Sequence, residues 1–533
     1  MKASERSETS HANGAGPGVP ARERVGGPGG AKPPGWTMRR AHAIAVLVVL
    51  VLAGTHAQQQ GRFAVRAFGA AGDGKAIDTD AINKAIDAAV KAGGGTVVFH
   101  AGTYLAGSIH LQSHVALFLD HGATIEAGPI DRAPCDPPEP NAWDKYQDFG
   151  HSHWHNSLIW GENLDDVAIF GTGTIRGTAL SRSANANSPA GTGNKAIALK
   201  NSRNVTIRDI TIVHGGHFAI LATGVDNFTV DNVKMDTNRD GIDVDACRNV
   251  RLSNMTVNSP FDDGICLKSS YGLGVARATE NVTITNCQVS GYDEGTYADG
   301  TYKRTVKYGG ARDRGPTGRI KFGTESSGGF RNVTISNCLF DYSRGLAIES
   351  VDGGPIEDVT ITNITMRDIA NAPIFIRRGN RARTPGDPPP GVIRRVTISN
   401  VVASGVAGAH GILISGIPGY PIEDLRLSGI RIAYAGGGTK EDAELVPEEK
   451  EKEYPEPDMF GRIPAYALFA RHVIGLDVRG ADFTFDTPEV RPAIRLEDVE
   501  RADMDDVRAQ KPGTTTREMM HPLHLDRVVK AAY

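Results

Sequence analysis

The chain has 533 residues, of which 63 are glycine; 40% of the residues are hydrophobic and only 6% are aromatic. This composition favours many short strands and turns over a helical bundle. The formal net charge of −4 is small for this length and excludes a strong field for nucleic acid. The five cysteines include no C-x-x-C pair, so the sequence predicts neither a zinc site nor a disulfide framework and leaves a single bridge open.

Residues 1–57 are predicted to be an N-terminal extension that ends in a secretory signal peptide. The stretch MRRAHAIAVLVVLVLAGTHAQQQ begins with basic residues, continues with an apolar run at Ala43–Ala53 and ends in small residues. The run is short for a bilayer span, so a membrane anchor is the weaker alternative. We expect a secreted or periplasmic protein whose mature chain starts near Gln58 and has no membrane span. Met1 and Met38 both fit a translation start.

A short capping helix is predicted next. The stretch DTDAINKAIDAAVKAGGG opens with aspartates that can cap a helix and closes on three glycines that end it. Its apolar residues fall on one helical face: Ala81, Ile82, Ala85, Ile86, Ala89 and Val90. We expect this helix to cover the open end of a solenoid, because the terminal coil would otherwise expose its core.

A histidine-rich stretch, GHSHWHNSLIW, contains His151, His153 and His155 around Trp154. Three histidines suggest a metal, but no acidic partner stands at a fixed spacing, so a groove wall or a coil turn is favoured. Trp154 is a candidate for stacking on a sugar ring. No metal ion and no cofactor are expected.

The body of the chain is a repeat. The unit recurs as NVTIRDITI, NFTVDNVKM, NVRLSNMTV, NVTITNCQV, NVTISNCLF, DVTITNITM and RVTISNVVA, starting at residues 204, 227, 249, 281, 332, 358 and 395. Such a unit, two short strands around an Asn or Asp, buries its apolar face only by stacking on its neighbours. The period lies in the low twenties where loops are short, which predicts an all-β fold, a right-handed parallel β-helix. A leucine-rich horseshoe, the alternative, lacks its leucines.

The sixth residue of each unit predicts a tight corner. Its type tolerates left-handed backbone and hydrogen-bonds to nearby groups. In chain order these residues are Asp209, Asn232, Asn254, Asn286, Asn337, Asn363 and Asn400. We expect an asparagine ladder, and we interpret the N-x-[ST] matches in the repeats as structural rather than as glycosylation sites. Cys287 and Cys338 share a repeat position and are expected to be core fillers rather than metal ligands.

One charged segment interrupts the late coils. Residues 436–462, GGGTKEDAELVPEEKEKEYPEPDMFGR, contain prolines and many carboxylates, and the simplest interpretation is a solvated loop. Coil-like sequence resumes at IPAYALFARHV. Residues 58–533 are therefore expected to form a single β-helix domain with this insertion.

Carboxylates gather in two adjacent repeats, DTNRDGIDVD and SPFDDGICLKS. Asp240 and Asp262 are 22 residues apart (262 − 240), which is one coil, so the motifs are expected side by side at a strand spacing of ~4.8 Å. Together with Asp263 they form a patch of like charges in which at least one carboxyl is held protonated near neutral pH. Glycoside hydrolysis needs such an acid beside a base. A calcium cage is the alternative, and Asp243 and Asp245 are expected to be solvated or structural neighbours.

The ordered set of motifs resembles glycoside hydrolase family 28, the polygalacturonase-like enzymes of pectin breakdown. AFGAAGDGKAIDTDAINKAIDAA, GGGTVVFHAGTY, NRDGIDV, FDDGICLKS and the repeats carry the resemblance over residues 65–473. It implies that Asn238 and Asp240 match the family's Asn-x-Asp motif, and that Asp262 and Asp263 match its Asp-Asp motif. Asp262 would then be the general acid, while Asp240 and Asp263 would hold and deprotonate the attacking water, with inversion at the anomeric carbon.

The chain departs from the family at the substrate-binding positions. In TGRIKFGTESSGG, Gly318 or Arg319 stands where the family has its histidine. In GLAIES, Ala347 and Glu349 replace the cations of the family's Arg-Ile-Lys. We expect plain homogalacturonan to be a poor substrate, because Glu349 would repel a galacturonate carboxylate.

Other charged side chains are candidates for a replacement subsite. Strand alternation places Arg319, Lys321 and Glu325 on one face, where they either point into the groove or belong to a charged outer surface. Lys268, just after the strand GICL, is a similar candidate for binding substrate.

Two classes of function fit these motifs. The first is a secreted inverting hydrolase of pectic or related polysaccharide or oligosaccharide; exo action is favoured because residues 281–332 and 436–462 hold long loops that can wall off a groove. The second is a polysaccharide lyase or a non-catalytic glycan-binding β-helix. In both, the partner is a glycan, no nucleic acid is bound, and the protein is expected to be a monomer.

Overall fold

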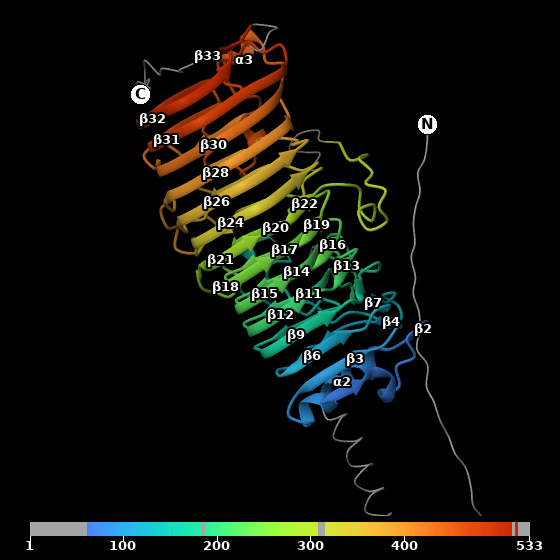
Figure 1. Cartoon of the computed structure of the whole chain (residues 1–533). Helices are drawn as coiled ribbons and strands as arrows, with labels where there is room; N and C mark the ends of the chain where they lie inside the picture. The colour runs from blue at the N-terminus through green and yellow to red at the C-terminus, as the bar shows by residue number, and fades with distance from the viewer. Residues whose placement is uncertain (1–60, 149, 184–186, 308–314, 514–517, 521–533) are drawn as a thin grey trace, which may run out of the picture. The chain divides into compact units, whose positions relative to one another are not determined.

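The computed structural model describes residues 61–513 and 518–520, apart from residues 149, 184–186 and 308–314. The extension and signal peptide predicted for residues 1–57 lie outside the described residues. From residue 61 onward, short strands form coils that stack in register, each coil pairing in parallel with the next (Figure 1). The prediction of an all-β fold, a right-handed parallel β-helix, is confirmed.

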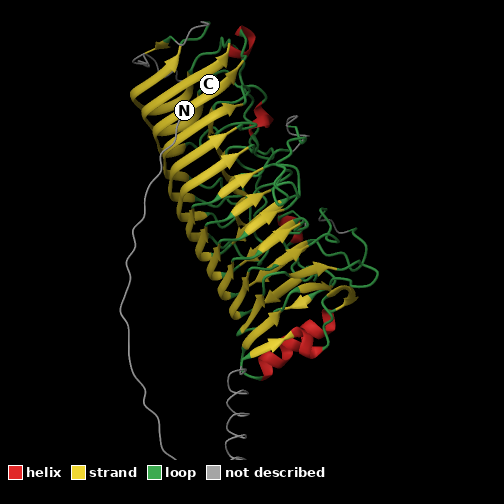
Figure 2. Ribbon diagram, turned by 45° about the vertical axis from the view of Figure 1, so that its right-hand side comes forward, coloured by secondary structure: helices red, strands yellow, loops and turns green. Residues whose placement is uncertain are grey.

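After the first coil, which holds only β1 (Arg62–Ala64) and β2 (Asp73–Ile77), each of the early coils contributes one strand to each of three stacks of parallel strands (Figure 2). The first, called the site sheet below, consists of β5 (Ile109–His110), β8 (Ile159–Glu162), β11 (Lys195–Lys200), β14 (Phe218–Thr223), β17 (Asp240–Asp245), β20 (Ile265–Ser269), β23 (Ile320–Ser326), β25 (Leu346–Ser350), β27 (Ile374–Arg378) and β29 (Ile412–Ser415). The second consists of β1 (Arg62–Ala64), β3 (Gly95–Phe99), β6 (Val115–Leu119), β9 (Asp165–Gly171), β12 (Arg203–Arg208), β15 (Asp226–Asp231), β18 (Arg248–Ser253) and β21 (Thr279–Thr285). The third consists of β2 (Asp73–Ile77), β4 (Gly102–Ala106), β7 (Ala123–Ala127), β10 (Thr174–Arg176), β13 (Thr211–Val213), β16 (Lys234–Asp236), β19 (Thr256–Asn258) and β22 (Gln288–Ser290).

In the later coils, single long strands run through both the second and the third sheet. β21 and β22 pair with successive parts of the same strand, β24. The long strands are β24 (Phe330–Asp341), β26 (Ile356–Arg367), β28 (Ile393–Val406), β30 (Ile422–Gly436), β31 (Leu468–Thr487) and β32 (Ile494–Gln510). The start of β31 also extends the site sheet from β29, and β33 (Met519–Met520) pairs antiparallel with β32.

The predicted capping helix is present as α2 (Thr79–Lys91), preceded by the 3-10 helix η1 (Val65–Phe68). Its buried residues are Ala81, Ile82, Ala85, Ile86 and Ala89, which belong to the main core of the coils. Val90 differs from the prediction, since it is 37% exposed. Eight residues beyond Ile82 rotate the helix about 80° past that side chain, so Val90 turns toward solvent.

Two amide ladders follow the corners of the coils. At the sixth repeat position, left-handed backbone is present as predicted, and Asn363 Nδ2 donates to Asn337 Oδ1 at 3.0 Å. The first repeat position forms a second ladder that was not predicted, in which Asn249 Nδ2 donates to Asn227 Oδ1 at 3.1 Å and Asn281 Nδ2 donates to Asn249 Oδ1 at 3.0 Å. Each amide therefore satisfies a neighbour on the next coil while holding a turn.

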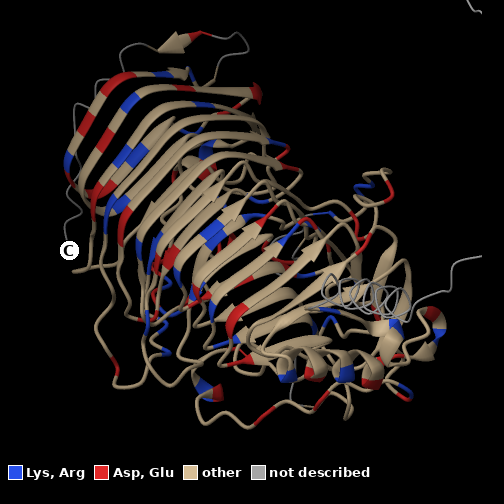
Figure 3. Cartoon of the chain, turned by 60° about the horizontal axis from the view of Figure 1, so that its bottom comes forward, with Lys and Arg blue, Asp and Glu red and all other residues tan. Residues whose placement is uncertain are grey.

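The cysteines at the shared repeat position lie in the core, as predicted. All five cysteines are buried and free, so the single bridge left open by the sequence does not form; Cys287 and Cys338 pack in the main core. On the coil surfaces both signs of charge lie on neighbouring strands (Figure 3), as in the pair of Arg426 Nε and Asp477 Oδ2 at 3.0 Å. Within the part of the chain that the structure describes, no helix is long and apolar enough to cross a membrane.

The insertion at residues 436–462 is not simply a solvated loop, which corrects the expectation for its second half. It contains α3 (Lys440–Ala443) and the 3-10 helix η3 (Pro457–Phe460). Phe460 packs in a buried apolar cluster with Ala347 and Phe375, on the outer face of the site sheet. The apolar residues of PDMFGRIP explain this packing, because the small side chain of Ala347 leaves room for them to be buried against the sheet.

Candidate active site

The three candidate carboxylates come from two adjacent coils of the site sheet. Asp240 is the first residue of β17, and Asp262 and Asp263 stand just before β20. The backbone N–H of Gly241 donates to the carbonyl oxygen of Asp263 at 3.0 Å, so the register places Asp263, not Asp262, directly beside Asp240. One oxygen from each of the three carboxylates lies within 4.8 Å of the others. The motifs are therefore neighbours as predicted, with an offset of one residue.

A glycine follows Asp240 because the next coil leaves no room for a side chain. A Cβ at Gly241 would lie 2.3 Å from Val257 Cγ1 and 2.4 Å from the carbonyl oxygen of Gly264. Glycine lets the two backbones approach closely. That approach brings the carboxylates of the two coils together.

Two cations hold Asp263 from the following coil. Arg319 Nε donates to Asp263 Oδ1 at 2.7 Å, and Lys321 Nζ lies 3.5 Å from Asp263 Oδ2. Both cations are fully buried, at 1% exposure each. Glu325, further along β23, pairs with Lys268 Nζ at 3.2 Å. The four charged candidates therefore lie on the side of the site sheet away from the core, where they are buried, while Ile320 and Phe322 between them pack in the core.

Asp262 is the most accessible of the three carboxylates, with 21% of its side chain exposed. Its oxygen pairs with the guanidinium of Arg239. Arg239 is the middle residue of the Asn-x-Asp motif. It was not among the site residues predicted from the sequence, although it is adjacent to Asp240.

The surroundings divide the protons of the cluster unequally. Burial raises the pKa of Asp240 well above its usual value, and the charges of Asp243 and Asp262 add to the rise. Burial also works to raise the pKa of Asp263, but Lys321, Arg319 and Lys268 outweigh it and hold that pKa well below its usual value. The surroundings therefore favour the protonated form of Asp240 and the ionised form of Asp263.

A second charged layer lies behind the carboxylates. His151 Nε2 lies 3.2 Å from Asp243 Oδ2, and Lys268 Nζ lies 3.8 Å from the same oxygen. Asp243 and Asp245 are both 0% exposed, so they are structural and not solvated. Asp245 accepts hydrogen bonds from the backbone N–H and the hydroxyl of Ser270. This layer ties the histidine-rich stretch to the coils of the site.

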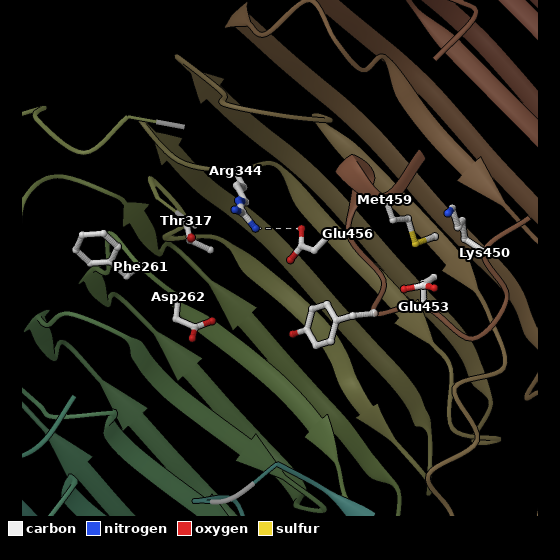
Figure 4. Close-up of a pocket in the computed structure, with 9 residues that line it drawn as sticks. Phe261, Asp262, Thr317, Arg344, Lys450, Glu453, Glu456 and Met459 are labelled. Carbon is white, nitrogen blue, oxygen red and sulfur yellow. Dashed lines mark ion pairs between the residues drawn. The ribbon is translucent and has the colours of Figure 1, made fainter. Parts of the chain in front are cut away.

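A pocket of about 340 Å³ opens in front of Asp262 (Figure 4). The coils contribute one wall and the insertion contributes the other. The lining residues are Phe261, Asp262, Thr317, Arg344, Lys450, Glu453, Tyr454, Glu456 and Met459. Two aromatic side chains, Phe261 at 37% and Tyr454 at 46% exposure, offer faces on which a sugar ring can pack.

Two predicted substrate contacts take other roles. Trp154 is 0% exposed and its indole N–H donates to Thr223 Oγ1 at 3.1 Å, so the expectation that it stacks on sugar is wrong. Glu139 accepts the backbone N–H of Trp154, which folds this loop back and turns the ring into a small apolar cluster with Phe218. Asn238, nearly buried, donates to Glu294 Oε2 at 3.1 Å at the edge of the site.

Glu349 does not face the groove as a lone negative charge. It is 0% exposed, and its carboxylate lies 3.4 Å from Lys321 Nζ. Burial raises the pKa of Glu349 to about 7. The expected repulsion of a galacturonate by Glu349 itself is therefore corrected, because a buried and paired carboxylate presents little charge to the pocket.

Among the residues that the structure describes, two groups of side chains bring ligand-type atoms within 4.8 Å of one another: Asp240 with Asp262 and Asp263, and Asp240 with His151 and Asp243. A divalent ion would bring positive charge to these carboxylates. Here that charge comes from Arg319, Lys321 and Lys268.

Several pocket residues gave no signal in the sequence. Glu456 pairs with Arg319 and with Arg344 Nη1 at 3.1 Å, and Lys321 Nζ lies 3.4 Å from the hydroxyl of Tyr454. More than a hundred residues separate Glu456 and Tyr454 from these partners. A local pattern cannot register such contacts.

Fold and site together define a class, a right-handed parallel β-helix protein with a carboxylate cluster on one sheet. The family model "Right handed beta helix region" matches residues 163–356, and the model "Rhamnogalacturonase A/epimerase, pectate lyase-like" matches residues 63–127. A Vitis vinifera protein named "Probable polygalacturonase" is 26% identical over 396 residues, covering 70% of this chain and 74% of that protein.

Two solved structures share the fold at low identity. A family 28 exopolygalacturonase of Yersinia enterocolitica has a TM-score of 0.60 at 17% identity, covering 85% of this chain and 79% of that one. A hyperthermoactive exopolygalacturonase of Thermotoga maritima has a TM-score of 0.55 at 19% identity, covering 70% of this chain and 87% of that one. The chain is a right-handed parallel β-helix protein that is similar to these polygalacturonases.

Proposed function

We propose that this protein is a secreted inverting glycoside hydrolase that acts on a pectic or related glycan, with residues 58–533 as its one catalytic domain. The observation that carries the proposal is the convergence of Asp240, Asp262 and Asp263 within 4.8 Å of one another, with Asp262 lining a pocket that has aromatic walls. The names of the similar proteins, polygalacturonase and exopolygalacturonase, support the substrate class.

The carboxylates divide the chemical work. The proton of the cluster, which burial favours on Asp240, passes to the leaving oxygen through Asp262, the carboxyl that faces the pocket, while Asp263, held ionised by its cations, accepts a proton from the attacking water. Asp240 and Asp263 oxygens no more than 4.8 Å apart can share one water, because two hydrogen bonds of ~2.7 Å span that distance. The oxygens are closer than the ~6.5–9.5 Å usual between the two carboxyl groups of inverting enzymes. The shared water is the basis for proposing inversion.

The pocket favours exo action. The insertion at residues 436–462 forms one wall beside Asp262, so a glycan chain meets a barrier at this end of the groove. An enzyme with such a barrier releases small products from a chain end.

A glycan panel tests this proposal. Purified protein is incubated with polygalacturonic acid, rhamnogalacturonan and neutral-capped pectic oligosaccharides, and both reducing sugar and ultraviolet-absorbing unsaturated product are measured. We expect reducing sugar without unsaturated product, small products at early times and an inverted first-formed anomer by nuclear magnetic resonance. Unsaturated product would indicate a lyase, a retained anomer would refute the mechanism, and binding without any product would indicate a glycan-binding protein.

A further inference from the structure

Six charged side chains form a set of linked ion pairs between the site sheet and the insertion. The cations are Arg319, Lys321 and Arg344, and the carboxylates are Asp263, Glu349 and Glu456. Each cation lies within ion-pair distance of at least one of these carboxylates. Three positive charges thus face three carboxylates beside Asp262, in a place largely shielded from water.

Glu456 is the member of this set that comes from the insertion. Arg319 donates to both of its oxygens, through Nη1 at 3.1 Å and Nη2 at 2.5 Å, and Arg344 Nη1 reaches it at 3.1 Å. Figure 4 shows the Glu456 carboxylate aimed at Arg344 across the pocket that Asp262 lines. A guanidinium fork on two carboxylate oxygens is the geometry in which Arg binds a free carboxylate. Glu456 therefore occupies the contacts that the carboxylate of a bound sugar acid would make.

The fold holds Glu456 firmly in this place. Phe460, four residues later, packs with Ala347, and the guanidinium groups of Arg377 and Arg471 donate to backbone carbonyls of residues 447–450. Burial works to raise the pKa of Glu456, but Arg319, Arg344 and Lys321 outweigh it and lower that pKa to about 2. The internal carboxylate is thus ionised across the whole working pH range.

We propose that Glu456 determines specificity as an internal carboxylate, so that the sugar-binding position beside Asp262 takes a neutral pyranosyl unit and excludes a uronate. A uronate would bring a fourth carboxylate to a set whose three cations are already paired. The small Ala347, standing where a cation is expected, also seats the segment that delivers Glu456. The catalytic consequence rests on the proposed hydrolase function, whereas the binding preference does not.

The test uses galactose and galacturonate, two ligands that differ only in the substituent at C5. Calorimetry measures their binding to the full chain, to Glu456→Gln and to the control Glu453→Gln, which removes an exposed charge from the same pocket wall. We expect the wild type to bind galactose at least as tightly as galacturonate. Glu456→Gln should bind galacturonate about ten-fold more tightly, with galactose changed less than about three-fold, because one charge pair is gained. Glu453→Gln should leave the ratio of the two affinities unchanged.

Three results would overturn the inference. They are a wild type that prefers galacturonate, an unchanged ratio in a Glu456→Gln variant with native circular dichroism, and a Glu456→Gln variant that binds neither sugar. The wild-type affinities for the two sugars test the inference even if the Glu456→Gln variant fails to fold. Hydrolysis without a shift in binding preference would reject the role of Glu456 alone, and a shift in preference without hydrolysis of any glycan would reject the proposed hydrolase alone.

Discussion

At the scale of single residues, the site works by giving similar carboxyl groups different surroundings. Asp240 is buried near Asp243 and Asp262, whereas Asp263 is buried against Arg319 and Lys321. The same chemical group is therefore protonated in one place and ionised in the other, which is how an acid and a base coexist near neutral pH.

Replacing the pocket-facing acid should abolish turnover and leave the fold unchanged. In Asp262→Asn we expect kcat to fall by about 10²–10⁴-fold, because an amide cannot protonate the leaving oxygen. Initial rates on the best glycan of the panel measure the effect. The melting temperature should stay within about 2 °C, since the coil core does not depend on an outward carboxylate. Activity within ten-fold of the wild type would remove Asp262 from its role.

The proton on Asp240 should depend on Asp243. A negative Asp243 raises the pKa of Asp240, so Asp243→Asn lowers it, and the proton is lost at lower pH. The high-pH limb of kcat/KM should therefore move to lower pH. Asp245→Asn, an equally buried change two residues away, is the control and should leave the limb in place. An unshifted limb in Asp243→Asn would show that Asp240 does not carry the proton that limits activity.

At the scale of elements, the repeat is stabilised twice, by a shared core and by amide ladders at its corners. Asn249 illustrates the second contribution, since it has φ of 56°, donates to Asn227 and accepts from Asn281. Asparagine is suited to this position because it tolerates left-handed backbone and its amide can both donate and accept.

Two substitutions of Asn249 separate the contribution of the left-handed backbone to stability from the contribution of the amide ladder. Asn249→Ala loses both, and we expect a loss of about 2 kcal/mol in unfolding free energy, whereas Asn249→Gly keeps the left-handed backbone and should lose about half as much. Equilibrium urea unfolding measures both values. Equal losses in the two variants would mean that the hydrogen bonds alone matter, and no loss in either would make the ladder a consequence of the fold.

The composition of the insertion does not reveal its role in forming the pocket. Charged and proline-containing, it reads as a loop, yet Phe460 anchors it on the site sheet and Tyr454 and Glu456 close the pocket. Its many carboxylates are not uniformly solvated, because one of them is matched to two guanidinium groups on the coils.

At the scale of the whole molecule, the coils need protected ends. α2 buries five of its side chains against the first coils, and an uncovered coil end would expose both apolar core and strand edges. The site sits on the middle coils, away from this cap (Figure 1).

A charged residue on the buried face of α2 should therefore cause the protein to self-associate before it changes catalytic activity. In Ile86→Asp the new carboxylate has no partner in the core, so the helix should detach and the exposed coils should self-associate. Light scattering with size exclusion measures the assembly state. Lys84→Asp introduces the same residue on the exposed face of the helix and should remain as the wild type. A monodisperse Ile86→Asp variant of native size would argue against the capping role.

The coils could be predicted from the sequence, because each repeat carries its own alternation and its own corner residue, and the offset to the next repeat lies in the low twenties where loops are short. Asp240, Asp262 and Asp263 followed from that regularity, since neighbours in a solenoid are one period apart. The one-residue error in register arose because the pairing depends on Gly241 and the backbone of the next coil rather than on the count of residues. Tertiary packing alone determines where the Trp154 side chain points, the pairing of Glu349 with Lys321 and the pairing of Glu456 with Arg319. Those contacts join segments far apart in the chain, and packing between such segments leaves no periodic signal in either one.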